Sequence, residues 1–394
     1  MWAGLSPGSS AHIHSTARAP RAVSSTHGSI EARKGTPMTL ISKHTLLGSV
    51  LAVVAVGALA CGSNGGGASA TATAAATTAA TAAATATQVA LPAIPTTGGP
   101  SSFFVLAGPL NVGVYKMAEV QALPVSKVST NAKAGTGELG LHEYSGPLLY
   151  DLLMKAQPKL DAAKPNDAFR KSIVVTATDG YQTAIGWGEI DPKLGNKKIL
   201  LAYQRDSAAL PDADGFVRLV VPGDAAAGRY ISNVAKIELR DVGTNPAVTS
   251  DRKPTTSVAV SGLIKNAGDL DAAKLGAMKQ STATVKDASG ASITYGGVLL
   301  SDLVTAVVPT LDDKRKNDQL GFGVLGIGSN GYSALVVGGE WDTKFANAPI
   351  LIATSQDGKP LAATDGFARL VVPNDAGTSR FISNLSKLEV IRLD

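Results

Sequence analysis

Four arginines are the side chains in this sequence best suited to bind a ligand: Arg218, Arg229, Arg369 and Arg380. A guanidinium group is planar, and its N–H donors form a fork that matches a carboxylate or a phosphate. A small anionic ligand is therefore one interpretation. The other is an internal salt bridge with Asp214, Asp224 or Glu238, or with their counterparts later in the chain. The sequence leaves both interpretations open.

Two tyrosines, Tyr181 and Tyr332, are further ligand candidates, because each directly follows a turn sequence. The dipeptides at 179–180 (Asp-Gly) and 330–331 (Asn-Gly) lie between β-rich runs. Such dipeptides are typical of β-hairpins, where both turn positions tolerate a positive φ. We expect Asp179 and Asn330 to serve the turn rather than a ligand. The tyrosines either offer a stacking surface or pack beside the hairpin.

Acidic residues also recur in pairs, Glu189 with Asp191 and Glu340 with Asp342. Paired carboxylates are able to do acid–base work or to bind a hard cation. We expect a solvated strand edge here instead.

Histidine and cysteine are nearly absent from the part of the chain that should fold. Four of the five histidines lie within the first 44 residues, and the fifth, His142, has Ile293 at its corresponding position. The single cysteine is Cys61. A catalytic triad or a histidine-based metal site would rest on His142 alone, so we predict neither.

The chain repeats itself at an interval of 151 residues. Residues 206–240 align without a gap to residues 357–391, and 18 of the 35 positions are identical. Arg218 and Arg229 correspond in this way to Arg369 and Arg380. We therefore predict two tandem copies of one domain, at 101–241 and 255–394, joined by a linker at 242–254.

Each copy has the same expected order of elements. Alternating apolar segments at 103–108 and 257–262 predict strands, and 117–123 and 272–278 predict short helices. Leucines at helical spacing follow a glycine at 146 and at 297, which predicts that a turn at this glycine connects a strand to a helix. Further strands are expected at 172–178, 181–186, 199–202, 218–222 and 237–240, with their counterparts in the second copy. This mixture predicts an α+β domain.

A family resemblance rests on these segments. The stretch Tyr-Ser-Gly-Pro-Leu-Leu at 144–149, the Asp-Gly-Tyr at 179–181, the Leu-Leu-Ala at 200–202 and the Asp-Gly-Phe-Val-Arg-Leu-Val-Val-Pro at 214–222 resemble the molybdopterin-binding oxidoreductase domain of sulfite oxidase-like proteins. The resemblance covers about 140 residues in each copy. It implies a mixed-sheet fold and, in catalytic members, a molybdenum–pterin cofactor with one cysteine thiolate on the metal.

This sequence departs from that pattern at the metal. Neither copy contains a cysteine, and thiolate is the soft ligand that this chemistry uses. Ser-Asn at 232–233 and 383–384 stands where a basic–aromatic pair would be expected, and we predict turn residues there. We therefore expect no cofactor, and a domain that binds a small anionic ligand or a protein partner without catalysis. Two alternatives remain: a molybdopterin-dependent oxidoreductase with altered or shared metal ligation, and a purely structural envelope protein, which an arginine-lined groove between the copies would disfavour.

The N-terminal region predicts export and anchoring. Residues 1–60 read as a leader in which Met38 is the expected true start and an apolar run ends at Cys61. The small residues before this cysteine resemble the lipobox of bacterial lipoproteins, so we expect Cys61 to be lipidated. Residues 61–100, rich in Ala and Thr, predict a flexible tether. The protein would then be exported and anchored by lipid in the bacterial cell envelope, on the outer membrane or facing the periplasm, with the membrane as partner.

Net charge excludes nucleic acid as a partner. Residues 1–60 hold five basic residues and one acid, whereas the rest of the chain has 31 basic and 30 acidic residues. A nucleic-acid-binding domain would need a basic patch with interleaved aromatics, and no such block occurs after residue 60.

Overall fold

The computed structural model describes residues 91–134, 137–138, 140–243 and 246–394. The expected leader with its start at Met38, the lipidated Cys61 and the tether up to residue 90 lie outside the described residues. The end of the expected tether, residues 91–100, contains no helix or strand. Within the described residues, no helix is long and apolar enough to cross a membrane.

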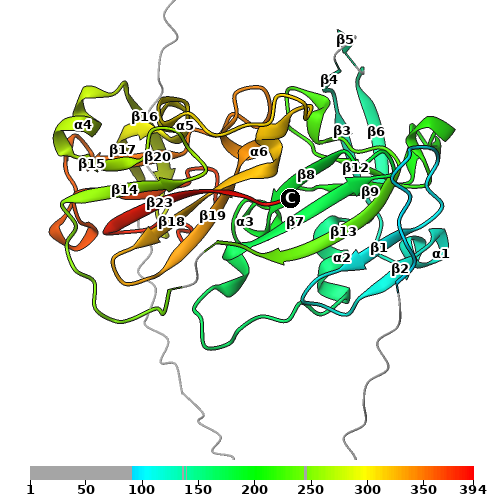
Figure 1. Cartoon of the computed structure of the whole chain (residues 1–394), viewed down its shortest axis with the longest axis horizontal. Helices are drawn as coiled ribbons and strands as arrows, with labels where there is room; N and C mark the ends of the chain where they lie inside the picture. Colours follow the sequence, from blue (N-terminus) through cyan, green and yellow to red (C-terminus); the bar gives the residue numbers. More distant parts are fainter. Residues whose placement is uncertain (1–90, 135–136, 139, 244–245) are drawn as a thin grey trace, which may run out of the picture. The chain divides into compact units, whose positions relative to one another are not determined.

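A mixed five-stranded sheet organises the first half of the folded part, residues 101–241 (Figure 1). Its strand order is β2-β1-β13-β7-β8. Strand β1 runs parallel to β13, and the other neighbours are antiparallel. Every residue of β7 is buried, which explains its run of β-branched residues. The five strands are β1 (Phe104–Ala107), β2 (Gly113–Tyr115), β7 (Lys171–Ala177), β8 (Gln182–Gly186) and β13 (Val234–Asp241).

Smaller sheets and short helices complete this half. The sheet orders are β11-β10-β6-β3, β12-β9 and β4-β5. Their strands are β3 (Ser126–Thr130), β4 (Lys133–Ala134), β5 (Gly137–Glu138), β6 (His142–Gly146), β9 (Leu200–Ala202), β10 (Gln204–Arg205), β11 (Ala208–Ala209) and β12 (Arg218–Val220). The helices are α1 (Met117–Gln121), α2 (Leu149–Lys155) and α3 (Trp187–Ile190), with 3-10 turns η1 (Asp167–Arg170), η2 (Asp212–Asp214) and η3 (Ala227–Arg229).

The second half, residues 255–394, contains a five-stranded sheet with the equivalent order β15-β14-β23-β18-β19. Here β14 is the strand that runs parallel, to β23. These strands are β14 (Ser257–Gly262), β15 (Gly268–Asp271), β18 (Phe322–Gly328), β19 (Ser333–Val337) and β23 (Leu385–Arg392).

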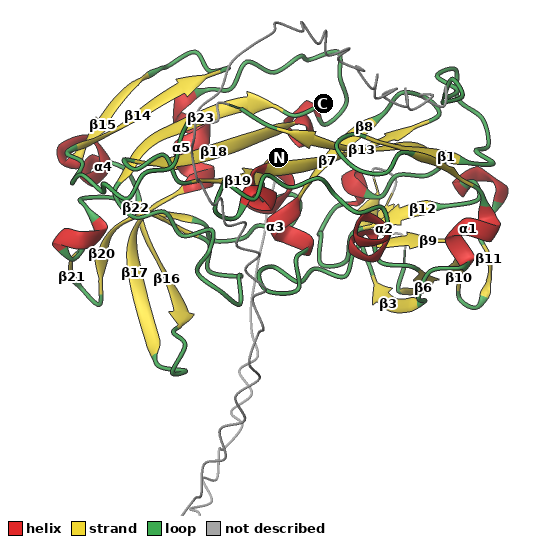
Figure 2. Ribbon diagram, turned by 90° about the horizontal axis from the view of Figure 1, so that it is seen from below, coloured by secondary structure: helices red, strands yellow, loops and turns green. Residues whose placement is uncertain are grey.

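The remaining elements of the second half follow the same sequence of types. A second sheet has the order β16-β17-β20-β21, and β22 pairs with β20. Figure 2 shows β16 and β17 as a hairpin that projects from the rest of this half. The elements are β16 (Gln280–Lys286), β17 (Ser292–Leu299), β20 (Leu351–Gln356), β21 (Lys359–Pro360), β22 (Arg369–Val371), α4 (Ala272–Ala277), α5 (Leu300–Val307), α6 (Gly338–Trp341), η4 (Asp318–Gly321) and η5 (Ala363–Asp365).

The core is aliphatic, as the scarcity of aromatic residues predicts. Helix α2, for example, buries Leu149, Leu152 and Leu153 at helical spacing. Each such side chain stabilises the fold by roughly 1.5–3 kcal/mol. A smaller cluster joins the two halves, because Ala184 of β8 and Val242 pack with residues of β18 and β19. The halves are therefore in direct apolar contact.

The expected α+β class is confirmed, since mixed sheets dominate and the helices are few and short (Figure 2). The strands and helices expected from the sequence are present, most with ends shifted by one to three residues.

The expectation that the acidic pairs lie on a solvated strand edge is wrong for their glutamates. Glu189 and Glu340 lie on the short helices α3 and α6, only 3% and 5% exposed, not on a solvated strand edge. Buried arginines neutralise them, which makes their burial tolerable.

Candidate functional site

The turns before the two tyrosines are built by side-chain acceptors. Asp179 Oδ1 accepts from the Tyr181 amide at 2.9 Å, and Asn330 Oδ1 accepts from the Tyr332 amide at 3.2 Å. The positive φ falls on the glycines, at +83° for Gly180. The predicted turns are confirmed, but the Asp/Asn choice reflects this local hydrogen bond and not a positive φ at that residue.

Each tyrosine hydroxyl then ties the two halves together. Tyr181 donates to the Gly228 carbonyl at 2.7 Å and accepts from Asn317 Nδ2 of the other half at 2.9 Å. The second half reciprocates, because the Tyr332 hydroxyl donates to the Ser379 carbonyl and accepts from Asn166 Nδ2 at 2.7 Å. Hairpin packing is therefore the main role of both tyrosines, and it places them at the walls of two cavities.

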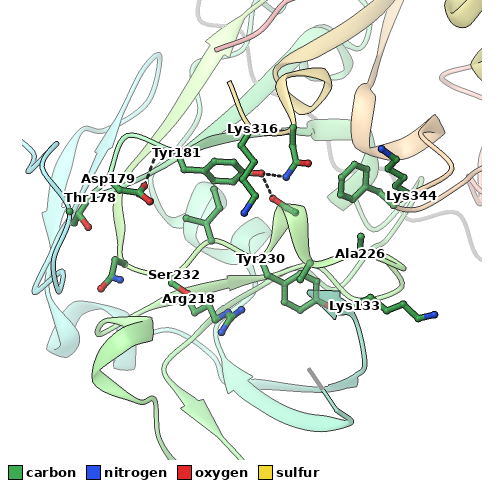
Figure 3. A pocket seen from close by; sticks show the side chains of 18 of the residues that line it. Lys133, Thr178, Asp179, Tyr181, Arg218, Ala226, Tyr230, Ser232, Lys316 and Lys344 are labelled. Atoms are coloured by element: carbon green, nitrogen blue, oxygen red, sulfur yellow. Dashed lines mark hydrogen bonds between the residues drawn. The ribbon is translucent and has the colours of Figure 1, made fainter. Parts of the chain in front are cut away.

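The first cavity has a volume of about 660 Å³ and is lined by both halves (Figure 3). Tyr181 forms one wall, and Tyr230 and Arg218 lie across from it. Residues 316–317 and 344–345 of the second half close the cavity. In Figure 3, Lys316 reaches into the space between the two tyrosines, whereas the amine of Lys133 points away from it.

Positive charge dominates this lining. Four cationic residues are among those that line the cavity, and Asp179 is the one carboxylate among the lining residues. Two of the cations, Lys316 and Lys344, take part in no ion pair among the described residues. Cations without an acidic partner attract an anion. The other two are Lys133 and Arg218.

Arg218 is held in place by its neighbours. It lies on β12, and its Nη1 donates to Asp214 Oδ1 at 2.5 Å. Its guanidinium carbon lies 6.0 Å from the centre of the Tyr230 ring, within cation–π range. Its Nε is buried without a hydrogen-bond partner among the described residues and has no accessible surface, so Nη2 is the donor that remains for a ligand. The salt bridge and the ligand role are thus compatible at this residue.

The tyrosines of the cavity stay protonated at neutral pH. Burial raises the pKa of Tyr230 to about 12, although a hydrogen bond with Thr130 opposes the shift. Burial likewise raises the pKa of Tyr181. Neither hydroxyl adds a negative charge, so the cavity keeps its cationic character across the physiological range.

Arg229 and Arg380 line neither cavity. Arg229 is completely buried, and its Nε and Nη2 each donate to Asp224 at 2.6 Å while Nη1 donates to Glu189. Arg380 makes the equivalent bonds with Asp375 and Glu340. The salt-bridge interpretation therefore applies to these two arginines, and their donors are occupied inside the protein.

A glycine of the opposite half lies against each buried arginine. A Cβ added to Gly339 would be 2.5 Å from Arg229 Cδ, and one added to Gly188 would be 2.4 Å from Arg380 Cδ. Both glycines sit on the helices that carry the buried glutamates. The ion pairs of each cluster lie within one half, and the contact between the halves at these clusters is close packing of arginine against glycine.

The candidate ligand residues thus separate into three places. Tyr181 and Arg218 share the first cavity. Tyr332 and Arg369 share a second cavity of about 300 Å³. Arg229 and Arg380 lie in the buried clusters. The sequence analysis does not single out the lysines of the first cavity as ligand candidates, because isolated lysines resemble solvated surface residues. The asparagines that bond the two tyrosines do carry a signal in the sequence, since Asn166 recurs as Asn317 at the repeat interval.

The predicted turn role of the Ser-Asn pairs is confirmed. Asn233 and Asn384 have φ values of +53° and +50°. Ser232 donates to Asp214 at 2.8 Å and Ser383 to Asp365 at 2.6 Å, so each serine fixes the carboxylate that holds an arginine. His142, half-buried on β6, bonds to Asp206 at 2.6 Å and lines neither cavity.

Comparison with known proteins finds a family similarity for part of the chain. Residues 116–246 match the family model described as "Oxidoreductase molybdopterin binding domain". Among solved structures, the crystal structure of the sulfane dehydrogenase SoxCD from Paracoccus pantotrophus is similar, at 13% identity and a TM-score of 0.30. That similarity covers 68% of this chain and 62% of the other, so the chain spans less than two thirds of its length. No curated protein matches.

The residues present do not fit the molybdenum of that family's cofactor. The only cysteine, Cys61, precedes the described residues, so residues 91–394 offer no thiolate. Among the described residues, no group of three histidines, cysteines or acids is placed to hold a metal ion. The first cavity supplies cations and aromatic walls, which suit an organic anion but provide no soft metal ligand.

Proposed function

We propose that this protein is a lipid-anchored envelope protein whose folded part binds a small organic anion without catalysis. The observation that carries the proposal is the first cavity, where Arg218 and Lys316 lie beside aromatic walls and Asp179 is the one carboxylate among the lining residues. Its volume of about 660 Å³ is within the range of small-molecule sites. The aromatic walls favour a flat apolar body, and Arg218 with Lys316 favours a carboxylate or phosphate group on it.

The architecture that goes with this proposal is a tandem duplication. Residues 101–241 and 255–394 would be two copies of one molybdopterin-oxidoreductase-like domain, joined by a linker at 242–254. The equivalent strand orders of the two central sheets support this. Lipidation of Cys61 and a tether up to residue 100 would hold the copies at a membrane of the cell envelope, on the periplasmic or outer face. A cavity between the halves that contains Arg218 disfavours a purely structural role.

A binding experiment on the whole exported chain tests the function. Thermal shift against aromatic carboxylates and phosphate-bearing heterocycles at low ionic strength identifies a ligand, and calorimetry gives its affinity. We expect Lys316→Gln to weaken that affinity by about tenfold, because it removes a charge-assisted hydrogen bond. The matched control is Lys198→Gln, an exposed lysine outside the cavity that bonds to Asn196. Equal affinity in both variants would refute the site.

The second candidate function is a molybdopterin-dependent oxidoreductase with altered or shared metal ligation. The match of residues 116–246 to the molybdopterin-binding family favours it. Molybdenum and released pterin should be measured on protein purified from molybdate-replete cells of the native host. One equivalent of each per chain would replace the non-catalytic proposal, whereas a folded protein without either would support it.

A further inference from the structure

The second cavity differs from the first in size and in charge. It has about 300 Å³ and is lined mostly by polar side chains of the second half, with Asn166 from the first. Arg369 and Tyr332 occupy the positions equivalent to Arg218 and Tyr181. Pro165 stands 151 residues before Lys316, so the lysine that reaches into the first cavity has no counterpart here. The smaller space disfavours a bulky organic ligand.

No carboxylate lines this second cavity, but two guanidinium groups do. Asn330 replaces Asp179, the single acid of the first cavity, so one negative charge is exchanged for a neutral amide. Arg252 is exposed and pairs with no carboxylate of the described residues. The lining therefore has an excess of positive charge in a space too small for most metabolites.

Arg369 is positioned to donate further hydrogen bonds. Its Nη1 bonds to Asp365 at 3.1 Å, and its guanidinium carbon lies 5.7 Å from the Tyr295 ring and 5.6 Å from the Phe381 ring. These contacts fix the plane of the group. Its Nε is buried without a partner among the described residues and has no accessible surface, so the Nη groups are the donors that remain for a ligand.

We propose that the second cavity is a separate binding site for a small inorganic oxyanion of the phosphate or sulfate type. Arg252 and Arg369 supply the charge, and Thr378 and Ser379 line the same space, whereas the Ser383 hydroxyl donates to Asp365. A tetrahedral oxyanion presents several acceptor oxygens to such a set of donors, and arginine is suited to it. This site stands on its own residues and does not depend on the ligand of the first cavity.

Titration of the whole chain with inorganic phosphate, followed by calorimetry at low salt, tests the site. We expect Arg252→Gln to weaken phosphate binding by at least about tenfold, as loss of a charge-assisted bond does. Lys253→Gln is the matched control: it removes the adjacent exposed lysine, which lines neither cavity, and should change affinity by less than about twofold.

A second variant keeps the test independent of Arg252. Asn330→Asp restores the residue type found at position 179 and places a carboxylate in the cavity, so it should abolish phosphate binding while far-ultraviolet circular dichroism confirms folding.

Lys316→Gln, in the first cavity, should leave phosphate affinity unchanged, whatever it does to an organic anion. Glycerol 3-phosphate should bind more weakly than free phosphate, since the space is small; tighter binding would overturn the inorganic ligand. The proposal fails if wild type binds no phosphate at millimolar concentration, if both second-cavity variants bind normally, or if Lys316→Gln removes the binding.

Discussion

Replacing Arg229 with methionine should destabilise the folded part strongly. Arg229 is fully buried and donates to Asp224 and Glu189 over distances of 2.6–2.9 Å. Methionine fills similar space but leaves two buried carboxylates with only Lys197 to balance them. Removing one partner of a buried ion pair costs about 3–5 kcal/mol, because the remaining charge is uncompensated.

Urea denaturation at pH 7, followed by circular dichroism, measures this cost as the change in the free energy of unfolding. The control is Lys127→Gln, which breaks a pair with Glu143 whose side chains are 60% and 39% exposed. That change should cost less than about 1 kcal/mol. Adding Glu189→Gln and Asp224→Asn to the Arg229→Met variant should recover part of the loss, since it removes the orphaned charges.

A ligand role for Arg229 would give a different result. If Arg229→Met lowered the free energy of unfolding by less than about 1 kcal/mol while weakening ligand binding, the reasoning from burial and ion pairing would be refuted. The interpretation of Arg229 as an internal salt bridge would fall with it.

Three further changes probe the first buried charge cluster and the contacts between the halves. Burial opposes ionisation of Glu189, but Arg229 and Lys197 outweigh it and lower the pKa of that carboxyl. Ionised Glu189 therefore stabilises the fold above the usual glutamate pKa, and this contribution is lost as the pH falls. Lys197→Ala should cost about 1–2 kcal/mol in urea denaturation at pH 7 and less at pH 4; an equal cost at both would contradict the linkage. Gly339→Ala should cost about 1–3 kcal/mol, because its Cβ would overlap Arg229, and a neutral effect on the melting temperature would count against the packing. Asn317→Ala removes a bond between the halves and should cost about 1 kcal/mol in the same assay, with a cost near zero arguing against the contact.

The two buried clusters differ in one residue, and the pKa of the buried glutamate is shifted in opposite directions in the two. Lys197 bonds Glu189 at 3.1 Å, whereas the position 151 residues later is Ala348. Burial raises the pKa of Glu340, although Arg380 opposes it, and the nearby charge of Glu189 raises it further. The second cluster therefore holds a proton more readily than the first, despite equivalent arginine contacts.

Much of the fold could be predicted because its signals are local. The Asp-Gly and Asn-Gly turns, the leucine spacing of α2 and the 151-residue interval each lie within short stretches of sequence. Asp214 and Asp224 lie four and five residues from the arginines that they bind, so these pairs too could be anticipated.

The rest of the site depends on distant contacts. Arg229 meets Glu189 across 40 residues, and nothing around Glu189 marks it as buried. The first cavity forms only because Lys316 and Asn317 lie beside Tyr181, from which they are separated by more than 130 residues in the sequence. Such contacts follow from how the halves pack, which no periodicity within either half encodes.

The reciprocal bonds of Tyr181 with Asn317 and of Tyr332 with Asn166 have a consequence for the ancestry of the chain. In an isologous contact, residue i of one subunit meets residue j of the other while j meets i, which is the pattern of a twofold homodimer. Both pairs here keep the 151-residue spacing, as do the arginine–glycine contacts. A protein with one such half would therefore be expected to self-associate through this surface. Within one chain the two sides of this contact need not stay identical, and the two cavities differ in size and in charge.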